Sequence, residues 1–125
     1  MNILLKNLPA ELLAGTRELL PRLGLTEAPD GTPLTAGKGA KLYAGKKDGG
    51  VRITYTALPE YFRALSMLPR VLNGGEVEED PYDGMLCLMS DNSRNAVLTV
   101  DSAKRMIRDL ALMGFNSLML YTEDT

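Results

Sequence analysis

The sequence predicts an α+β fold in two parts, and three observations support this prediction. Residues 1–81 combine short alternating stretches, which indicate antiparallel strands, with two helical stripes of leucine and aromatic residues. Residues 82–125 instead contain an apolar run, an amphipathic helix and a second apolar run, which is the pattern of a β-α-β unit. The chain has 125 residues, 45% hydrophobic and 24% charged, which is enough for one domain with a real core.

The first elements are a strand over residues 2–6 and a helix within residues 8–25. Gly15 weakens the centre of this helix, Pro21 is expected to bend or end it, and Gly24 is a plausible stop. Its apolar stripe consists of Leu12, Leu13, Leu19, Leu20 and Leu23.

Residues 26–40 are rich in proline, glycine and threonine, so we predict a loop with room for a short strand around Leu34. A hairpin follows, because two alternating stretches flank Asp48-Gly49-Gly50, and these residues tolerate positive φ. In the second of these strands, one face is expected to hold Val51, Ile53 and Tyr55.

Residues 58–75 predict a second helix, with Pro59 at its start and a kink at Pro69. The acidic residues 76–84 lack the order of carboxylates and glycine that a calcium loop requires, and they indicate a solvated edge strand and connector.

The second part begins with Met85–Met89, a continuous apolar run that predicts a strand buried on both faces. Asp101 is the expected N-cap of the next helix, and Gly114 is its expected end. The face predicted to point inward consists of Met106, Ile107, Leu110, Ala111 and Met113. A second buried strand over residues 116–124 completes a parallel unit. Such a unit is not a finished core, so we expect a truncated piece of a larger α/β array.

Composition excludes several classes of function. The net charge is −2, which argues against a general nucleic-acid-binding surface, and Lys41–Lys47 is interpreted as a solvated strand. The chain has no histidine and one cysteine, Cys87, so a self-contained zinc enzyme and a Ser-His-Asp hydrolase are both excluded. No run is long enough to span a membrane, and the expected location is the cytoplasm.

The order of motifs in residues 82–125 resembles the start of the catalytic barrel in glycoside hydrolase family 20, the β-N-acetylhexosaminidases. The pieces that carry the resemblance are Asp83-Gly84, Asp91-Asn92-Ser93-Arg94, Lys104–Ala111, Asn116-Ser117-Leu118 and Glu123-Asp124. Upstream, Glu60–Leu68 resembles the last helix of the α+β accessory domain that many members carry, whereas residues 1–57 match by element order only.

The resemblance implies that residues 1–81 are an accessory domain and that residues 82–125 are the first β-α-β unit of a truncated (β/α)₈ barrel, with its site at the carboxyl ends of the strands. Arg94 then binds hydroxyls of a terminal N-acetylhexosamine, and Asp91 orients Arg94. Asp124 corresponds to an aspartate that orients a histidine supporting the general acid. From spacing alone, Asp91 and Asn92 could equally form a turn with a solvated Arg94, and Asp124 could belong to an ordinary acidic loop.

The family's mechanism is substrate-assisted, because the acetamido oxygen of the substrate attacks the anomeric carbon. The family's Asp-Glu pair, which orients the acetamide and protonates the leaving group, comes later in the barrel. The resemblance therefore implies a fragment without a catalytic residue of its own and without hydrolase activity, cofactor or metal. Met119 and Tyr121 depart from the family pattern, since many members carry histidines on this strand.

Two other interpretations stay open. The chain could be a non-catalytic binding or interaction module whose α/β part is completed by another chain. Whether it is such a module or a hydrolase fragment, the exposed parallel strands and the methionine-rich face of residues 106–119 favour self-association into a homodimer. The chain could also belong to a different barrel or doubly wound enzyme that shares only the β-α-β architecture. If the chain is a fragment of a family 20 enzyme, its partner is an N-acetylhexosamine-terminated glycan. None of the three interpretations involves a nucleic acid or a membrane.

Overall fold

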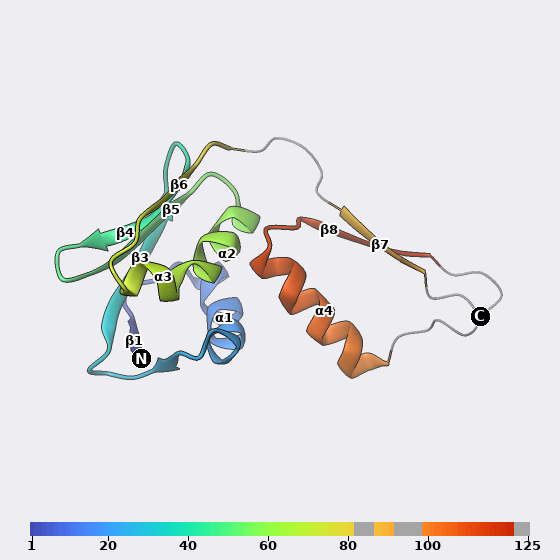
Figure 1. Cartoon of the computed structure of the whole chain (residues 1–125), viewed down its shortest axis with the longest axis horizontal. Helices are drawn as coiled ribbons and strands as arrows, with labels where there is room; N and C mark the ends of the chain where they lie inside the picture. Colours follow the sequence, from blue (N-terminus) through green and yellow to red (C-terminus); the bar gives the residue numbers. More distant parts are fainter. Residues whose placement is uncertain (82–86, 92–98, 122–125) are drawn as a thin grey trace.

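A computed structural model of the chain describes residues 1–81, 87–91 and 99–121. Within these ranges the strands form two sheets (Figure 1). The larger sheet has the strand order β2-β1-β3-β5-β4-β6, and the smaller sheet pairs β7 with β8. The strands are β1 (Asn2–Leu5), β2 (Thr26–Glu27), β3 (Thr32–Lys38), β4 (Leu42–Lys47), β5 (Gly50–Tyr55), β6 (Val77–Glu79), β7 (Cys87–Asp91) and β8 (Ser117–Tyr121).

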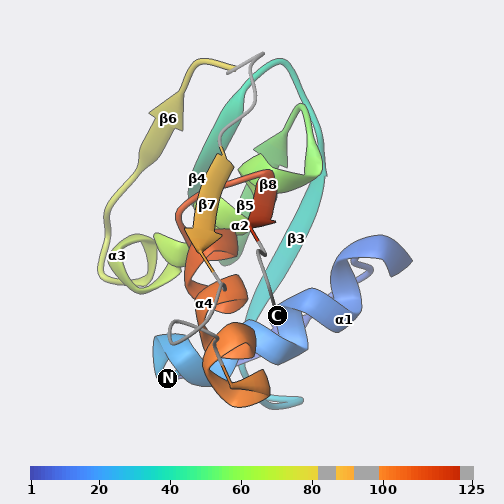
Figure 2. The ribbon, with the colours of Figure 1, turned by 90° about the vertical axis from the view of Figure 1, so that its right-hand side faces the viewer.

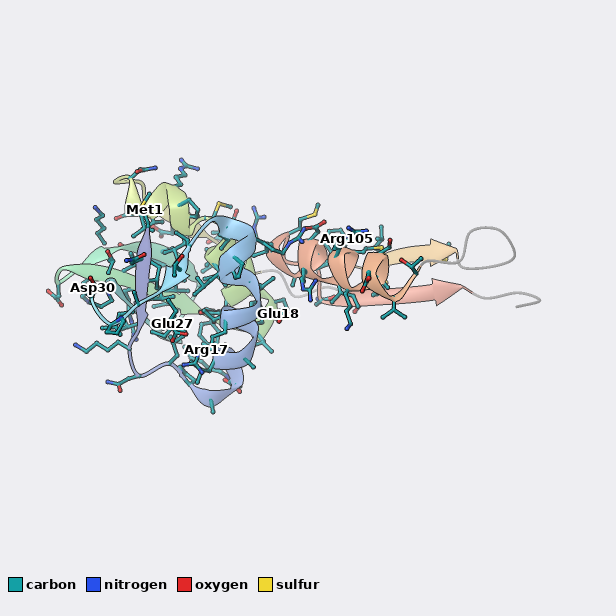
Figure 3. The ribbon with its side chains drawn as sticks, turned by 90° about the horizontal axis from the view of Figure 1, so that it is seen from below. Met1, Arg17, Glu18, Glu27, Asp30 and Arg105 are labelled. Carbon is teal, nitrogen blue, oxygen red and sulfur yellow. The ribbon has the colours of Figure 1, made fainter. Side chains whose placement is uncertain are left out.

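The helices lie in layers between the two sheets. One face of the six-stranded sheet is covered by α1 (Ala10–Leu19), the short 3-10 helix η1 (Leu20–Leu23), α2 (Leu58–Ser66) and α3 (Leu68–Leu72). Helix α4 (Val100–Leu112) packs on this helical layer, and β7 and β8 lie on the far side of α4 (Figures 1 and 2). Viewed from below, the β7–α4–β8 unit extends away from the six-stranded unit (Figure 3).

The six-stranded sheet is mixed, which corrects the prediction of antiparallel strands. Strand β1 runs parallel to both β2 and β3, and β3 runs parallel to β5, whereas β4 is antiparallel to β5 and β6. The helical connection through α1 returns the chain to the same end of the sheet, which permits parallel pairing of β1 with β3. The prediction rested on the hairpin, where antiparallel pairing is local and visible in the sequence.

The hairpin of β4 and β5 is confirmed. Asp48 and Gly49 form its two-residue turn with φ angles of 53° and 81°, and Lys47 pairs with Gly50. Positive φ at both turn positions matches the twist of the flanking strands. Val51, Ile53 and Tyr55 are buried toward the helices, as expected from the alternation.

The strand expected around Leu34 is confirmed, but it takes up more of residues 26–40 than the predicted loop allowed, because Thr32–Lys38 forms β3 in the middle of the sheet. Leu34 and Ala36 are its buried positions. The proline and glycine in this segment suggested a loop, but β3 is held by parallel neighbours on both sides, and these contacts are not visible in the local sequence.

Both prolines that were expected to interrupt helices do so. Helix α1 ends at Leu19, and Pro21 lies in the first turn of η1. Helix α2 ends at Ser66, and α3 begins at Leu68 with Pro69 in its first turn. In each case the ring lacks the N–H that a continuing helix would use, so a new short helix begins instead.

The contact between α1 and α2 is the tightest polar feature of the core. The fully buried Thr16 hydroxyl donates to the Leu12 carbonyl (2.7 Å) and lies 2.7 Å from the hydroxyl of the fully buried Tyr61. Since the one Thr16 proton is used, the Tyr61 hydroxyl must donate to Thr16 Oγ1. Beside this pair the Phe62 ring lies against Gly15, where an added Cβ would come within 2.6 Å of Phe62 Cζ.

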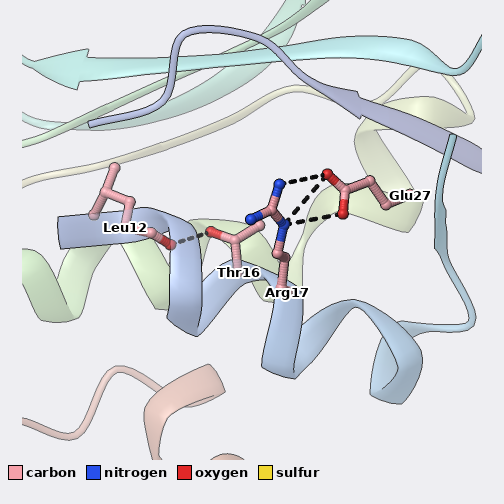
Figure 4. Close-up of polar contacts among 4 residues, drawn as sticks. All are labelled: Leu12, Thr16, Arg17 and Glu27. Carbon is pink, nitrogen blue, oxygen red and sulfur yellow. Dashed lines mark hydrogen bonds and ion pairs between the residues drawn. The ribbon is translucent and has the colours of Figure 1, made fainter. Parts of the chain in front are cut away.

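An exposed ion pair joins α1 to β2 on the outside of the unit. Arg17 Nε lies 3.0 Å from Glu27 Oε1, and Nη2 lies 3.1 Å from Oε2, so the guanidinium engages both carboxylate oxygens (Figure 4). Side chains this exposed contribute little stability individually, so the pair mainly orients β2 beside α1.

Among the helices in the described ranges, none combines the length and the apolar character that crossing a bilayer requires.

We predict that replacing Tyr61 with phenylalanine changes the dependence of stability on alkaline pH. Burial raises the pKa of Tyr61 from 10.0 to about 12. Between these pH values the unfolded chain releases the phenolic proton while the folded chain retains it, so native stability falls by about 1.4 kcal/mol per pH unit through this group. Tyr61→Phe should cost about 1 kcal/mol near neutral pH through the lost hydrogen bond, and this deficit should shrink and reverse above pH 10.

Denaturant unfolding of both proteins across this pH range measures the difference. Tyr43→Phe is the comparison variant, because that phenol is partly exposed and hydrogen-bonds to Glu76 outside the core. The hydrogen bond to Glu76 also raises the pKa of Tyr43, so a smaller change of the same sign is expected there. A constant stability difference between wild type and Tyr61→Phe at all pH values would contradict the prediction.

Candidate functional site

The candidate site is the edge of the small sheet at which β7 and β8 both end. The two strands run parallel and in register, from Cys87 opposite Ser117 to Asp91 opposite Tyr121. Their carboxyl ends therefore lie side by side, which is where parallel α/β architectures place their sites. Asp91 is the last residue of β7, so this candidate residue does lie at a strand end.

The other two candidate residues, Arg94 and Asp124, lie outside the described residues, as does most of the segment from Ser90 to Val97. Their roles in substrate binding and in support of the general acid stay predictions. The described structure places only the strand ends that precede them.

Helix α4 begins two residues earlier than predicted. Thr99 is its N-cap, with extended backbone angles (φ −69°, ψ 161°), and its hydroxyl accepts a hydrogen bond from the Ser102 N–H at 3.1 Å. The prediction of Asp101 as N-cap is wrong, because this residue is already helical. Its carboxylate lies in the first turn instead, where a negative charge favours the helix dipole.

The strand pair has one covered face and one open face. Leu110 on α4 is buried, and residues such as Phe115 and Leu118 line a cavity of about 200 Å³ between α4 and β8. On the opposite face Met89 and Met119 are register partners and are 61% and 53% exposed. The prediction that these strands are buried on both faces is therefore wrong for the described residues.

The inward-facing prediction for α4 is correct only in part. Leu110 and Ala111 pack inward as expected, but Ile107 and Met113 are more than half exposed. The helix has one neighbouring layer on each side, the six-stranded unit and a sheet of only two strands. Such a narrow sheet cannot cover the whole apolar stripe of the helix.

Two ion pairs fix α4 against the six-stranded unit. Arg108 on α4 donates to Glu18 on α1, with Nε 2.8 Å from Oε1, and Arg22 on η1 pairs with Asp109 on α4. The charges are reciprocal, because each unit contributes one cation and one anion. In both pairs the arginine side chain is 30% exposed and the carboxylate side chain 56%, so each contributes at most about 1 kcal/mol.

A cleft of about 260 Å³ lies where the two units meet, between α2, β6 and the end of α4. Its main polar feature is a two-point ion pair in which Arg63 Nε lies 2.6 Å from Glu79 Oε1 and Nη2 lies 2.7 Å from Oε2. The hydrogen bonds from Arg63 hold the pKa of Glu79 below its usual value. Glu79 is therefore ionised and engaged, so the acidic connector offers no general acid at this position.

The described residues contain no cluster of three or more histidine, cysteine, aspartate or glutamate side chains that could hold a metal. Cys87 is a free thiol at the start of β7 and is partly exposed.

We compared the chain with known protein families, curated proteins and solved structures, and only solved structures are similar to it. Neither a scan against protein-family models nor a search of curated proteins finds a match. Among solved structures, an inactive mutant of a family 20 exo-β-N-acetylglucosaminidase from Vibrio harveyi has a TM-score of 0.68 and 16% identity, over 96% of this chain and 22% of that one. The family 20 β-N-acetylhexosaminidase from Streptomyces coelicolor has a TM-score of 0.67 and 21% identity, over 96% of this chain and 30% of that one.

A mutant β-hexosaminidase from Streptomyces plicatus, in complex with the product GlcNAc, has a TM-score of 0.68 and 21% identity, over 95% of this chain and 29% of that one. The resemblance to glycoside hydrolase family 20 is therefore confirmed at the level of the fold. It extends over residues 1–57, where the sequence offered only element order. The chain spans less than a third of the length of these solved structures.

Sequence reasoning missed the residues that join the two units. The partners Glu18 and Arg108 are separated by 90 positions, and Arg22 and Asp109 by 87. In the sequence these residues look like ordinary charges on the solvent side of amphipathic helices. Their only signal is that each helical segment carries one cation and one anion that could pair with opposite charges on the other. Recognising this signal requires knowing that α1 and α4 are neighbours.

We predict that reversing one of these charges loosens α4. Glu18→Lys places a cation against Arg108, and should speed amide hydrogen exchange in α4 a few-fold, because an exposed pair contributes about 0.2–1 kcal/mol. The double variant Glu18→Lys/Arg108→Glu restores an attractive pair and should recover most of the protection.

Glu27→Lys is the matched control, because it reverses a solvent-exposed pair with Arg17 that joins α1 to β2 and does not include α4. Exchange in α4 that is unchanged by Glu18→Lys, or not recovered in the double variant, would show that these pairs do not hold the helix.

Proposed function

We propose that this chain is the N-terminal part of a glycoside hydrolase that removes terminal N-acetylhexosamine residues from glycans. The observation that carries the proposal is the fold likeness to family 20 enzymes over 96% of the chain. It is supported by the sequence motifs at the strand ends, because Asp91 closes β7 beside the end of β8.

In this proposal β7–α4–β8 is the first unit of a (β/α)₈ barrel. The exposed face of the strand pair supports it, because the side of a barrel strand opposite its helix is filled by side chains from the other strands. Met89 and Met119 lie on that opposite side and have no such neighbours in the described residues.

Arg94 is proposed to bind hydroxyls of the terminal sugar, with Asp91 orienting its guanidinium. A guanidinium is a planar group with five donors and can bridge two vicinal hydroxyls, which suits recognition of a sugar ring. Asp124, just beyond β8, is proposed to orient a histidine contributed by a later part of the barrel.

Hydrolysis is proposed to be retaining and substrate-assisted, with the substrate's own acetamido oxygen attacking the anomeric carbon. The 125 residues contain no Asp-Glu dipeptide, so the groups that would orient the acetamide and protonate the leaving oxygen are not supplied here. The isolated chain is therefore proposed to be inactive.

One observation favours a second candidate function, that of a non-catalytic module completed by another chain. The Met89–Met119 face is apolar and exposed, and parallel strands are normally covered on both faces. In that case the face would be covered in trans, by a partner or by a second copy, instead of by later strands of the same barrel.

We predict that Arg94→Ala lowers kcat/KM on a chromogenic N-acetylglucosaminide about a hundredfold, in a protein that carries these residues together with the remaining strands of a barrel. Two charge-assisted hydrogen bonds to the sugar would be lost, and at about 1.5 kcal/mol each, the low end for bonds to a charged group, their loss accounts for this factor. Arg94→Lys keeps the positive charge but loses the two-pronged geometry of the guanidinium, so its kcat/KM should lie between those of wild type and Arg94→Ala. Arg105→Ala, on the exposed side of α4, is the control and should be near wild type.

The same substrate tests the fragment. Turnover by the 125-residue chain well above background would contradict the proposed inactivity, and full activity of Arg94→Ala would remove Arg94 from the site.

A further inference from the structure

The larger sheet has a second face, on which the described residues place no helix. At the hairpin end of this face is a shallow concavity of about 410 Å³. Three of the residues that line it are cationic, Lys6, Lys47 and Arg52, and one is anionic, Asp48. This surface lies on the opposite side of the sheet from α4 and from the candidate hydrolase site (Figure 1).

Four neighbouring strands bring these groups together. Arg52 on β5 is the register partner of Thr35 on β3 and of Gly45 on β4. Lys6 directly follows β1, and its N–H donates to the Leu34 carbonyl of β3 at 3.1 Å. Lys47 is the last residue of β4. The cations therefore come from separate positions in the sequence and meet because of the sheet order β1-β3-β5-β4.

The cations of this concavity differ from the arginines that form ion pairs elsewhere in the described chain. Arg17, Arg22 and Arg63 each have a carboxylate partner. Within the described residues, Lys6, Lys47 and Arg52 make no ion pair or side-chain hydrogen bond. The whole chain carries a net charge of −2, whereas the lining of this concavity holds three cations and one anion.

Arg52 extends across the neighbouring strand. A Cβ placed on Gly37 would lie 2.6 Å from Arg52 Nη2, so the guanidinium runs over the bare backbone of β3. A guanidinium is a planar fork of donors, which suits the two oxygens of an anionic group. The Thr35 hydroxyl, between Lys6 and Arg52 in the strand order, adds a neutral polar group.

We propose that this concavity, formed by Lys6, Thr35, Lys47 and Arg52, binds the anionic groups of an acidic glycan. The shared chemistry is a carboxylate or a sulfate on a sugar, and the choice of a glycan rests on the proposed hydrolase function. The volume suits a small-molecule site. Binding to a single-stranded nucleic acid is disfavoured, because such sites use aromatic side chains for base stacking and no aromatic residue lines this concavity.

In a glycosidase, such a site would hold an acidic glycan on the six-stranded unit while the terminal sugar is processed elsewhere. The two surfaces are separate, so binding at the concavity does not require a complete barrel. The 125-residue chain is therefore sufficient for the test.

The binding test uses the whole chain with four probes of matched length: a sulfated dextran oligomer, an oligogalacturonate, neutral dextran and oligothymidylate. Titration followed by amide chemical shifts should show saturable binding to one or both acidic glycans, with shifts on β3, β4 and β5. Binding should weaken with added salt, and neutral dextran should not bind. The relative affinities for the sulfated and the carboxylated glycan identify the source of the anion.

The variant Lys6→Gln/Lys47→Gln should weaken binding of the acidic glycan about tenfold, since each exposed charge contributes up to about 1 kcal/mol. Both side chains are exposed, so the protein should remain folded, which an unchanged thermal unfolding profile checks. Lys104→Gln/Arg105→Gln is the matched control, because it removes two exposed cations from α4, far from the sheet (Figure 3), and should bind like wild type. Arg52→Lys tests the fork separately and should lose affinity without loss of charge.

The proposal is overturned if neither acidic glycan binds, if neutral dextran binds as well as they do, or if the control variant loses as much affinity as Lys6→Gln/Lys47→Gln. Oligothymidylate binding as tightly as the acidic glycans would overturn the assignment to a glycan. None of these readouts depends on hydrolysis, so failure here leaves the proposed hydrolase function standing, and an inactive enzyme leaves this binding result standing.

Discussion

The close contact between α1 and α2 determines where the rest of the structure can lie. It has an apolar part, in which Phe62 packs on Gly15, and a polar part, in which Tyr61 donates to Thr16 in a fully buried environment. A buried hydroxyl pair of this kind tolerates little displacement, because either partner would lose its hydrogen bond without regaining water. The two helices therefore form one rigid layer on the sheet.

This layer is what α4 packs against. The contact supplies buried area through Ala111 and Leu112, while Glu18 and Arg22 at the end of α1 and in η1 meet opposite charges on α4. The buried apolar area provides most of the stabilisation. The two ion pairs of opposite polarity favour one position of α4 along the helical layer over positions shifted along it. Because α4 connects β7 to β8, fixing α4 also fixes the direction in which their carboxyl ends point. As far as the described residues go, the six-stranded unit thus positions the ends of β7 and β8 and contributes no side chain of its own to them.

Local signals in the sequence predicted local structure well. The Asp48-Gly49 turn, the breaks near Pro21 and Pro69, and the parallel β-α-β unit all follow from short-range chemistry, as does the strand end at Asp91. The parallel pairing of β3 could not be predicted in this way, because its partner strands are distant in the sequence and its own residues favour a loop. The charges that hold α4 gave no signal for the same reason. Arg94 and Asp124 rest on motif order alone, which is information about a family and not about this chain's geometry.

The most informative sequence prediction was one that the described structure does not satisfy. Continuous apolar runs such as Met85–Met89 are typical of strands in parallel sheets that are covered on both faces, yet Met89 and Met119 remain more than half exposed here. The open face beside Lys47 and Arg52 differs in kind, because its strands alternate apolar residues toward the helices with polar ones away from them. A strand with alternating apolar and polar residues can leave one of its faces in water. A strand that is apolar throughout is suited to a sheet that is covered on both faces. The two exposed surfaces are therefore suited to different partners. The open face of the strand pair is suited to packing against further apolar structure, and the basic concavity is suited to binding a hydrated anion.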